Sequence, residues 1–479
     1  MKATRKTAVL MALVLTLVGI GTGIPSAVLA EDMPVAALRD EAGISRSADE
    51  IARAYADMNW LSGVVLVAKA GEPVYAQLFG MANQQDGIAN TMTTRFALGS
   101  IMKNYTAVMV LQQVERGALS LDDTLGQFGF GFSDPRAKAI TIRQLLHHRS
   151  GFGDIFTAEY RENQLAFDTI EKRLTLLRDK PLEFDPGTDE RYSNYGFDVL
   201  GAVLEKVGGK PFAQMLRDNI LTPLSLTHSV YPYDPEVGEQ SLRYSYNYAG
   251  EQSFVGLTEA HGPDGGLEAT AADVLAFYRA IFYSDTLLRR DGEAFADYFG
   301  THPVFWQSFG GGAGVSAAVE LDLVNDYQVV VLSNSDNLVA ELVSGRIVEA
   351  IRTGRYTPAA LPPHVYAYQQ YKQLGVEAFR ERFGEIYKAA GYTQFIGRTL
   401  NELGISLLAD SKWDEALEVF GALAATFPNA PQVYDSLARA YRDMGKPDKA
   451  QQAFSKALAL VPDFRSDYSE DNYGVAKAQ

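Results

Sequence analysis

The sequence predicts an α+β domain followed by a segment of paired helices. Two β-type runs within residues 63–79 and two more within residues 315–332 enclose a long helical and irregular stretch. A sheet assembled from distant parts of one chain is typical of the α+β class. After about residue 366 the hydrophobic pattern instead recurs every 34 residues. With 479 residues, of which 47% are hydrophobic and 21% charged, the chain is long enough for two or three domains and too apolar to be disordered overall.

The composition excludes several classes of function. The formal charge is −16, so no basic surplus is available for binding a phosphate backbone, and we expect no nucleic-acid partner. The chain has no cysteine, which excludes disulfides, thiolate zinc sites and cysteine nucleophiles. Its six histidines show no HExxH or similar spacing, so we expect no metal.

The first thirty residues have the pattern of a secretory signal peptide. Lys2, Arg5 and Lys6 precede an apolar run, and Ala30 follows two further apolar residues at the expected cleavage point. The run is short for a membrane span, which needs about 20 residues; an uncleaved anchor is the alternative. We therefore expect a signal peptide over 1–30 and a bacterial protein exported to the periplasm or beyond, with no stable membrane span after cleavage. Removal of the three basic residues changes the charge from −16 to −19.

Turn residues and hydrophobic periodicity place the remaining elements of the first domain. The predicted helices and strands are, in chain order, a helix at 49–58, strands at 63–70 and 71–79, helices at 100–116, 165–178, 195–207, 211–219 and 270–282, strands at 315–321 and 328–332, and a helix at 338–352. An irregular region before residue 267 contains the aromatic run Tyr244-Ser-Tyr-Asn-Tyr248, which either walls a substrate groove or packs under a loop.

A proline-rich linker over 353–365 separates this domain from a helical repeat region over 366–466. Matched residues lie 34 positions apart in two successive helix-turn-helix units; the pairs are Leu403 and Leu437, Ala416 and Ala450, Phe420 and Phe454, and Pro428 and Pro462. This is the tetratricopeptide period and pattern, although two ordinary helical hairpins can also match. The repeats suggest a protein partner, and the helical stretch at 366–390 either caps the array or docks it.

The chemistry of the chain centres on Ser100-Ile-Met-Lys103. At the start of a helix, residues three positions apart share one face, which places the lysine amine beside the serine hydroxyl. Serine needs such a base to become a good nucleophile, and a buried lysine can lose its proton. About one or two S-x-x-K matches are expected by chance in a chain of this length, so the flanking residues carry the argument.

The triplet Tyr192-Ser-Asn194 is the second candidate element. A tyrosine close to Lys103 can shuttle a proton to a leaving group, and an asparagine amide can bind a substrate carbonyl. Taken alone, the triplet is also compatible with a surface loop. His147 and His148 are interpreted as structural, His261 either lines the cleft or lies in a loop, and Asp154 is interpreted as solvated charge.

Four motifs together resemble the penicillin-recognising serine hydrolases, in the branch of class C β-lactamases, D,D-carboxypeptidases, D-aminopeptidases and related esterases. In chain order they are Phe96-Ala-Leu-Gly-Ser-Ile-Met-Lys103, Leu145-Leu-His-His-Arg-Ser-Gly151, Tyr192-Ser-Asn-Tyr-Gly196 and Gly265-Gly-Leu-Glu-Ala-Thr-Ala-Ala-Asp273. The resemblance covers about residues 45–352. It implies a β-lactamase-like fold, in which an antiparallel sheet flanked by helices lies beside an all-helical subdomain and the active site occupies the groove between them. It implies that Ser100 is the acylated nucleophile, Lys103 its base partner, Tyr192 a general base or acid, and Asn194 a substrate ligand.

The third element of this family departs from its usual form. Relatives carry K-T-G or H-x-G on the strand beside the serine, and the best match here is Phe309-Gly310-Gly311. Phe309 then replaces the cation, or Ser308 does if the register differs by one. The resemblance makes the N–H of Gly312 the second oxyanion donor, and Gly311 lets a substrate lie along the strand. Loss of the cation weakens the case for a β-lactam and favours an uncharged ester, amide or peptide.

The sequence thus predicts an exported serine hydrolase that forms an acyl-enzyme on a small-molecule or peptide substrate, without a cofactor. The alternative is a binding or scaffold protein, in which the hydrolase fold is catalytically degenerate and the tetratricopeptide repeats carry the function.

Overall fold

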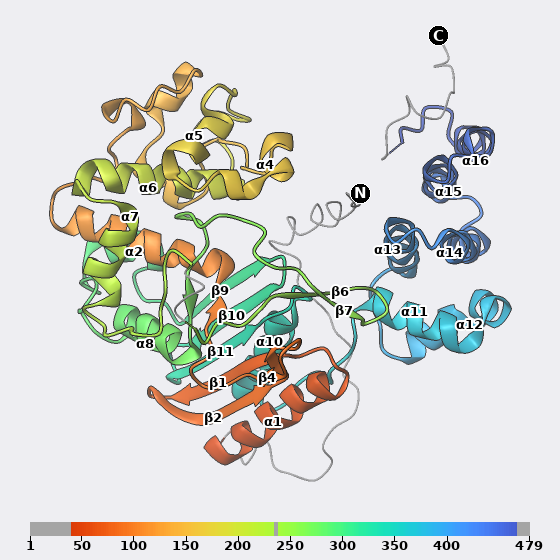
Figure 1. The fold of residues 1–479 in the computed structure, drawn as a ribbon, viewed down its shortest axis with the longest axis horizontal. Helices are drawn as coiled ribbons and strands as arrows, with labels where there is room; N and C mark the ends of the chain where they lie inside the picture. The colour runs from red at the N-terminus through yellow and green to blue at the C-terminus, as the bar shows by residue number, and fades with distance from the viewer. Residues whose placement is uncertain (1–39, 234–237, 467–479) are drawn as a thin grey trace. The chain divides into compact units, whose positions relative to one another are not determined.

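The computed structural model describes residues 40–233 and 238–466, which separate into two compact units (Figure 1). The first unit holds the described residues of 40–245 and 253–359, and the second holds 246–252 and 360–466. The predicted signal peptide lies outside the described residues. Within these ranges no helix combines the length and the apolar character needed to cross a membrane.

A five-stranded antiparallel sheet forms the centre of the first unit. Its strands, in spatial order, are β2 (Glu72–Phe79), β1 (Gly63–Lys69), β11 (Tyr327–Ser333), β10 (Val315–Asp322) and β9 (Phe305–Gly312). Strand β1 therefore pairs with β11, more than 250 residues later in the chain. Strands β10 and β11 are buried along their whole length, and short continuous apolar runs are typical of strands covered on both faces. These pairings confirm the α+β prediction.

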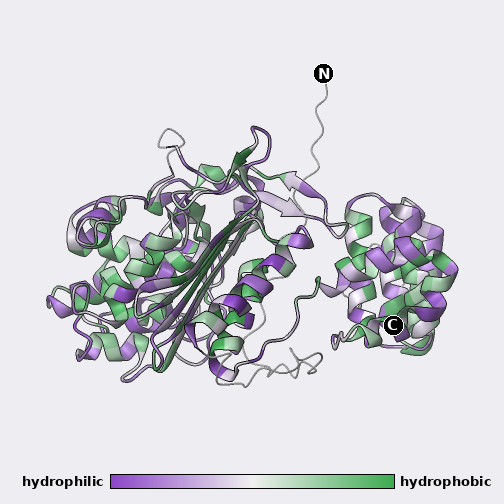
Figure 2. Cartoon of the chain, turned by 90° about the horizontal axis from the view of Figure 1, so that it is seen from below, coloured by the Kyte–Doolittle hydropathy of each residue, from purple (hydrophilic) through white to green (hydrophobic). Residues whose placement is uncertain are grey.

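Helices cover both faces of the sheet, which Figure 2 shows edge-on between them. Helices α1 (Glu41–Asp57) and α10 (Val339–Thr353) pack together on one face, and α8 (Ala271–Phe282) packs on the other. Aromatic side chains of β9 mark the two sides: Arg352 of α10 lies over the ring of Phe305, whereas Trp306 contacts Phe282 of α8. The alternation of β9 side chains between the two faces bears directly on the candidate site.

A helical region of the first unit follows strand β5 (Phe96–Ala97) in the chain. Its helices are α2 (Met102–Glu115), α3 (Ile142–Leu146), α4 (Ala158–Glu162), α5 (Ile170–Arg178), α6 (Asn194–Gly208) and α7 (Phe212–Leu216), with α9 (Glu293–Phe299) following later in the chain. Helix α2 is buried on all sides over 102–113, as a helix at the centre of a packed layer must be. The first turn of α2 carries the lysine of the S-x-x-K motif into this core.

Three short strand pairs tie the irregular segments to these layers. They are β3 (Met81–Asn83) with β4 (Ile88–Ala89), β5 (Phe96–Ala97) with β8 (Glu268–Ala269), and β6 (Tyr244–Tyr246) with β7 (Gln252–Phe254). The pairing of β5 with β8 is antiparallel, with Phe96 opposite Ala269. It brings the glycine-rich segment at 265–269 beside the chain that leads into Ser100.

Several boundaries differ from the sequence prediction because of local capping. Helix α1 begins eight residues before the predicted start because the carboxylate of Asp40 accepts a hydrogen bond from the N–H of Gly43. Helix α5 begins only at Ile170 because Thr169 is its N-cap. The predicted helix at 211–219 divides into α7 and a π-helical turn at 217–221. Strand β9 and helix α9 were not predicted as elements.

The second unit consists of helical hairpins. Its helices are α11 (Pro363–Leu374), α12 (Val376–Ala389), α13 (Ile396–Ala409), α14 (Trp413–Thr426), α15 (Pro431–Asp443) and α16 (Pro447–Leu460). Most of the apolar side chains at the 34-residue spacing lie in its interior, since Leu403, Ala416, Phe420, Ala450 and Phe454 are buried, whereas Pro428 and Pro462 are exposed. Helices α11 and α12 pack against α13 and α14 and extend the stack by one hairpin.

The segment 246–252 belongs to the hydrophobic core of this helical unit. The ring of Tyr248 lies edge-on to that of Tyr368, with centroids 4.8 Å apart, and the Lys412 ammonium lies 5.1 Å above Tyr248. Tyr244, by contrast, stays in the first unit, where its hydroxyl accepts a hydrogen bond from the N–H of Gln84. The aromatic run therefore packs in two cores, and this favours the packing interpretation over a groove wall.

Candidate active site

Ser100 lies in a single 3-10 turn, Gly99–Ile101, that leads directly into helix α2. The Nζ atom of Lys103 donates a hydrogen bond to Ser100 Oγ at 3.0 Å. The hydroxyl of Tyr192 donates to the same oxygen at 2.7 Å. The structure thus brings together three predicted residues, one of them 92 positions away in sequence, around one nucleophilic oxygen.

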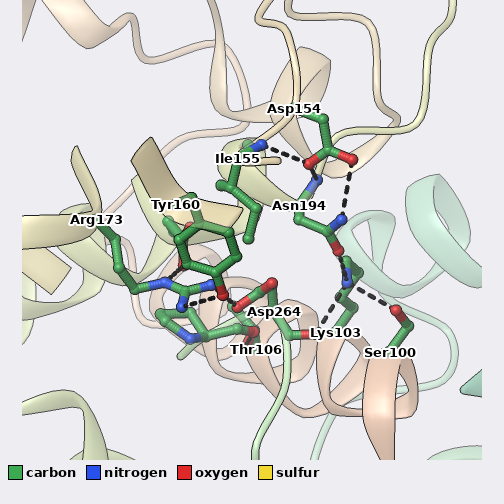
Figure 3. Close-up of polar contacts among 12 residues, drawn as sticks. Ser100, Lys103, Thr106, Asp154, Ile155, Tyr160, Arg173, Asn194 and Asp264 are labelled. Carbon is green, nitrogen blue, oxygen red and sulfur yellow. Dashed lines mark hydrogen bonds and ion pairs between the residues drawn. The ribbon is translucent and has the colours of Figure 1, made fainter. Parts of the chain in front are cut away.

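Lys103 is buried, with 5% of its surface exposed, and all three of its N–H bonds have acceptors (Figure 3). Besides Ser100, it donates to Asn194 Oδ1 at 2.7 Å and to the carbonyl oxygen of Asp264 at 2.9 Å. Burial is the largest influence and lowers the pKa of Lys103, but Tyr192, Asp264 and Asp154 together outweigh it, so the net pKa is raised. Three acceptors around Nζ need the three N–H donors of an ammonium. The ammonium places positive charge where the serine oxygen would become negative.

Tyr192 is held by the start of helix α6 and by His148. Ser193 is the N-cap of α6 and accepts from the N–H of Gly196 at 3.1 Å. The His148 ring packs on the Tyr192 ring with centroids 4.5 Å apart, and its Nδ1 accepts from the N–H of Ser193 at 3.2 Å. Burial and the charge of Lys103 lower the pKa of His148 to about 3, so the ring remains neutral and can accept this bond. His148 thereby supports the tyrosine.

Asp154 fixes the orientation of the Asn194 amide. One carboxylate oxygen accepts from the Asn194 N–H and the other from Asn194 Nδ2, each at 3.0 Å (Figure 3). Because Nδ2 is held by Asp154, the amide oxygen must face Lys103. The interpretation of Asp154 as solvated charge was wrong. It is a partly buried carboxylate that is linked to Lys103 through the Asn194 amide.

Replacement of Asp154 by asparagine is expected to lower kcat/KM for a neutral aryl ester by about 10- to 100-fold, because a misoriented Asn194 would misplace Lys103. The melting temperature at neutral pH should change by only a few degrees, because two effects oppose each other. Burial raises the net pKa of Asp154, so the stability that this group contributes is lost as the pH rises through that pKa, and a neutral amide avoids this loss. The amide, however, has only one oxygen and cannot accept all the hydrogen bonds that the two carboxylate oxygens accept. Steady-state kinetics and thermal unfolding test both parts.

The matched control for Asp154 is Asp122→Asn, which removes an exposed carboxylate that pairs with Arg143 in the same unit. It should leave both kinetics and unfolding near wild type. Full activity in Asp154→Asn would show that the amide of Asn194 needs no such anchor.

A buried ionic cluster holds the third acceptor of Lys103 in place. Arg173, with 1% of its side chain exposed, forms an ion pair with Asp198. It forms a second ion pair with the side chain of Asp264 (Figure 3). Thr106 of α2 donates to the carbonyl of Pro263 at 2.6 Å. Thr106 and Arg173 thus hold the segment 263–264 from two sides. These contacts keep the Asp264 carbonyl oxygen within hydrogen-bond distance of Lys103.

Strand β9 makes its closest approach to the serine at Gly310. A Cβ atom on Gly310 would lie 1.9 Å from the Leu98 carbonyl oxygen and 3.1 Å from the Ser100 nitrogen. Gly99 has φ +51, and a Cβ there would lie 2.9 Å from the nitrogen of Gly311. Only glycines permit this contact between the two backbones. It places the N–H groups of Ser100 and Gly311 in neighbouring backbone segments.

This geometry corrects the predicted register of the third motif. Side chains alternate along β9, so Phe309 shares the face of Phe305, on the side of α10, and is 37% exposed. Ser308 lies on the opposite face, where its Oγ accepts from Asn104 Nδ2 at 2.6 Å. Ser308, the alternative that the sequence left open, therefore occupies the position expected for the cation. Gly310 rather than Gly311 contacts Ser100, and the nearby N–H is that of Gly311 rather than Gly312.

Neutral groups surround Ser308, at the position where the resemblance predicts a cation. Asn104 also donates to the Tyr278 hydroxyl at 2.7 Å, and the Tyr298 hydroxyl lies 3.4 Å from Asn104 Oδ1. No residue of this cluster carries a positive charge. Among the described residues, no group of three or more histidine, aspartate or glutamate side chains is arranged to hold a metal.

Sequence reasoning misinterpreted Asp154 and missed Asp264 and Arg173. Asp154 and Asp264 each lie within three residues of a recognised motif, at Gly151 and Gly265, which is the one signal that pointed to them. Arg173 had no such signal, because its partners Asp198 and Asp264 lie 25 and 91 residues away.

Curated relatives of this chain include penicillin-binding proteins and an esterase. The chain is 30% identical to penicillin-binding protein 4 of Amycolatopsis lactamdurans, over 42% of this chain and 54% of the relative. It is 31% identical to esterase EstB of Burkholderia gladioli, over 40% of this chain and 53% of the relative. The chain thus spans about half the length of these curated relatives.

Solved structures with the same fold include a penicillin-binding protein from Bacillus halodurans, at 25% identity and a TM-score of 0.55, covering 63% of this chain and 99% of that one. Residues 407–470 match the tetratricopeptide repeat family. Residues 48–351 match the family described as beta-lactamase, which confirms the resemblance seen in the sequence. The chain belongs to the beta-lactamase family and carries a tetratricopeptide repeat segment near its C-terminal end.

Proposed function

We propose that this protein is an exported serine hydrolase that forms an acyl-enzyme on Ser100 with an ester, amide or peptide-like substrate. One observation carries the proposal: Ser100 Oγ receives hydrogen bonds from both the buried Lys103 ammonium, at 3.0 Å, and the Tyr192 hydroxyl, at 2.7 Å. Family membership and the penicillin-binding and esterase relatives support it. Against the alternative of a degenerate scaffold, every side chain needed for acyl transfer is present and in contact.

In the acylation step, the two hydroxyl groups first rotate so that Ser100 donates to the Tyr192 oxygen and Tyr192 donates to the leaving atom of the substrate. Ser100 Oγ then attacks the substrate carbonyl carbon while its proton passes to the Tyr192 oxygen. Tyr192 passes its own proton to the leaving oxygen or nitrogen, so Lys103 remains an ammonium throughout. The carbonyl oxygen becomes negative and accepts from the N–H groups of Ser100 and Gly311. Collapse of this intermediate breaks the bond to the leaving group and leaves the acyl group on Ser100.

In the deacylation step, a water molecule attacks the acyl-enzyme and gives a proton to Tyr192 as Tyr192 returns one to Ser100 Oγ. The acid product leaves, and the hydrogen bonds of the resting site form again. The Asn194 amide binds Lys103 here through its oxygen, so we propose that it positions the lysine as well as bordering the substrate. The repeat segment would bind a protein partner of the exported enzyme.

Intact-mass analysis after incubation with a fluorophosphonate tests this function. We expect the mass of one phosphonyl group to be added to the wild-type chain and none to Ser100→Ala. Turnover of a neutral p-nitrophenyl ester should accompany the labelling. A folded wild-type protein that gives no adduct with fluorophosphonates or penicillins, and no ester turnover, would favour the scaffold alternative.

A cephalosporin serves as the comparison substrate in the same assay. Its carboxylate would meet the neutral groups around Ser308 rather than a cation, so the neutral ester should turn over faster. Efficient cephalosporin hydrolysis would contradict the inference drawn from the missing cation while leaving acyl transfer intact.

A further inference from the structure

A cavity of about 170 Å³ opens in the first unit beside the turn that carries Ser100. Residues from six separate segments line it, among them Gly99, Asp168, Arg243, Glu259, His261 and Val315. Neither Ser100, Lys103 nor Tyr192 is part of its lining, so the cavity adjoins the reacting groups without containing them.

The position of the cavity identifies the part of a substrate that it would receive. In the proposed reaction the leaving group departs toward Tyr192, which protonates it. The acyl part must then extend away from Tyr192, past the N–H of Gly311 and along β9. Glu259 lies there, since its Oε1 is 3.6 Å from the position a Cβ atom would take on Gly312. The cavity is therefore on the acyl side of the reacting carbonyl.

The charges that line the cavity do not balance. Arg243 faces the carboxylate of Glu268 at 3.6 Å, and Asp168 pairs with Lys172 at 2.6 Å. Burial and the charge of Arg173 lower the pKa of His261, so this ring is neutral at pH 7. Within the described part of the chain, Glu259 has no hydrogen bond or ion pair at 4.0 Å or less. One carboxylate without a partner thus remains.

The environment of Glu259 makes this arrangement costly without a ligand. Burial and the nearby Asp264 raise the pKa of Glu259, and they outweigh the opposing charges of Arg243, Arg173 and Lys103, none of which contacts it. A carboxylate in such a place is stabilised by a positive charge brought into contact with it. A cationic ligand in the cavity would therefore supply the direct contact that the cations of the chain, which act on Glu259 only from a distance, do not make.

We propose that this cavity binds a positively charged group on the acyl part of the substrate, with Glu259 as its counter-ion. The inference rests on the proposed acyl-transfer function and narrows its substrate class to esters or amides of acids that carry an ammonium group a few bonds from the carbonyl. An aminoacyl group has this chemistry. Glu259 is a specificity residue and takes no part in proton transfer.

A matched pair of esters tests the proposal directly. The p-nitrophenyl ester of 4-(trimethylammonio)butanoic acid and that of 5,5-dimethylhexanoic acid have the same shape and differ by one charge. The ratio of their kcat/KM values is the readout, because any general loss of activity cancels in it. We expect the wild-type protein to prefer the cationic ester by about tenfold or more, mainly through KM.

In Glu259→Gln this ratio should fall to about one, and in Glu259→Lys it should fall below one. The matched control is Asp168→Asn, which removes a carboxylate of the same cavity that already has a partner, and which should keep the wild-type preference. Thermal unfolding of each variant confirms that the protein is folded. A wild-type ratio of one or less, or an unchanged ratio in folded Glu259→Gln, would overturn the proposal.

A binding experiment separates this proposal from the proposed function. In Ser100→Ala, calorimetric titration with 4-(trimethylammonio)butanamide and with 5,5-dimethylhexanamide reports on the cavity without turnover. Preferential binding of the cation supports the site even if no ester is hydrolysed, and equal or absent binding of both amides overturns it. Fluorophosphonate labelling of Ser100 in the wild-type protein reports on acyl transfer alone.

Discussion

Replacement of Lys103 by alanine is expected to reduce kcat/KM for a neutral p-nitrophenyl ester by at least about a thousandfold. The substitution removes three hydrogen bonds at once, to Ser100, Asn194 and Asp264. It also removes the positive charge that stabilises the serine oxygen as it loses its proton. Fluorophosphonate labelling of Ser100 should slow by a similar factor, and both rates can be measured on the same preparation.

Two further variants separate charge from geometry at this position. Lys103→Arg keeps the charge but presents a planar fork that cannot reach the same three acceptors, so most of the activity should still be lost. Lys138→Ala, which removes an exposed lysine of the same unit, should behave as wild type. Near-normal activity in folded Lys103→Ala would show that the lysine is dispensable and would contradict the mechanism.

The pH profile of the wild-type enzyme bears on the state of Lys103. Because its neighbours raise the net pKa of Lys103 despite burial, the ammonium persists over about pH 7 to 9, and its ionisation should not appear in kcat/KM there. A lysine acting as a neutral base would instead give a rate that rises as its proton is lost.

Removal of the Tyr192 hydroxyl in Tyr192→Phe is expected to lower kcat/KM by about 10²- to 10⁴-fold. The proton relay between Ser100 and the leaving group passes through this oxygen, which lies 2.7 Å from Ser100 Oγ. The phenylalanine ring keeps its packing on His148, so stability should change little. Stopped-flow measurement of p-nitrophenol release should show that both the burst and the steady-state phase become slower.

Tyr195→Phe is the matched control, because Tyr195 lies only three residues after Tyr192. Its hydroxyl is buried and donates to the Leu174 carbonyl at 2.7 Å, away from Ser100. Loss of that bond should cost about 1 kcal/mol of unfolding free energy and leave the chemistry unchanged. A Tyr192→Phe enzyme within about threefold of wild type would rule out tyrosine as the relay.

The sequence predicted the fold well because its central strands carry their own signal. Runs such as 63–69 and 327–333 are apolar, bounded by turn residues and too short for helices. The edge strand β9 escaped prediction because Phe305–Gly312 mixes exposed and buried positions and ends in three glycines. Gly310 is required by the close approach of β9 to the Leu98 carbonyl and the Ser100 nitrogen, which no local propensity reveals.

The same contrast between local signals and tertiary contacts explains which residues of the candidate site could be predicted. Ser100, Lys103 and Tyr192 were predicted because local motifs surround them. Phe309 was placed wrongly because a one-residue change of register moves a side chain to the other face of a strand. The three glycines that follow have no side chains, so they do not indicate which register is correct. The role of Asp154 depends on its contact with Asn194, 40 residues away. Neither segment of the sequence alone predicts a tertiary contact of this kind.

The placement of Tyr248 affects how the helical unit can fold. Its ring packs against Tyr368, 120 residues later in the chain, in a core otherwise built from short-range helical hairpins. Hairpins such as α13–α14 close over few residues and can form early, whereas the Tyr248 contact must close a long loop and carries a larger entropic cost. The repeat segment can therefore assemble by local steps, but its core is complete only after a distant piece of the chain has joined it.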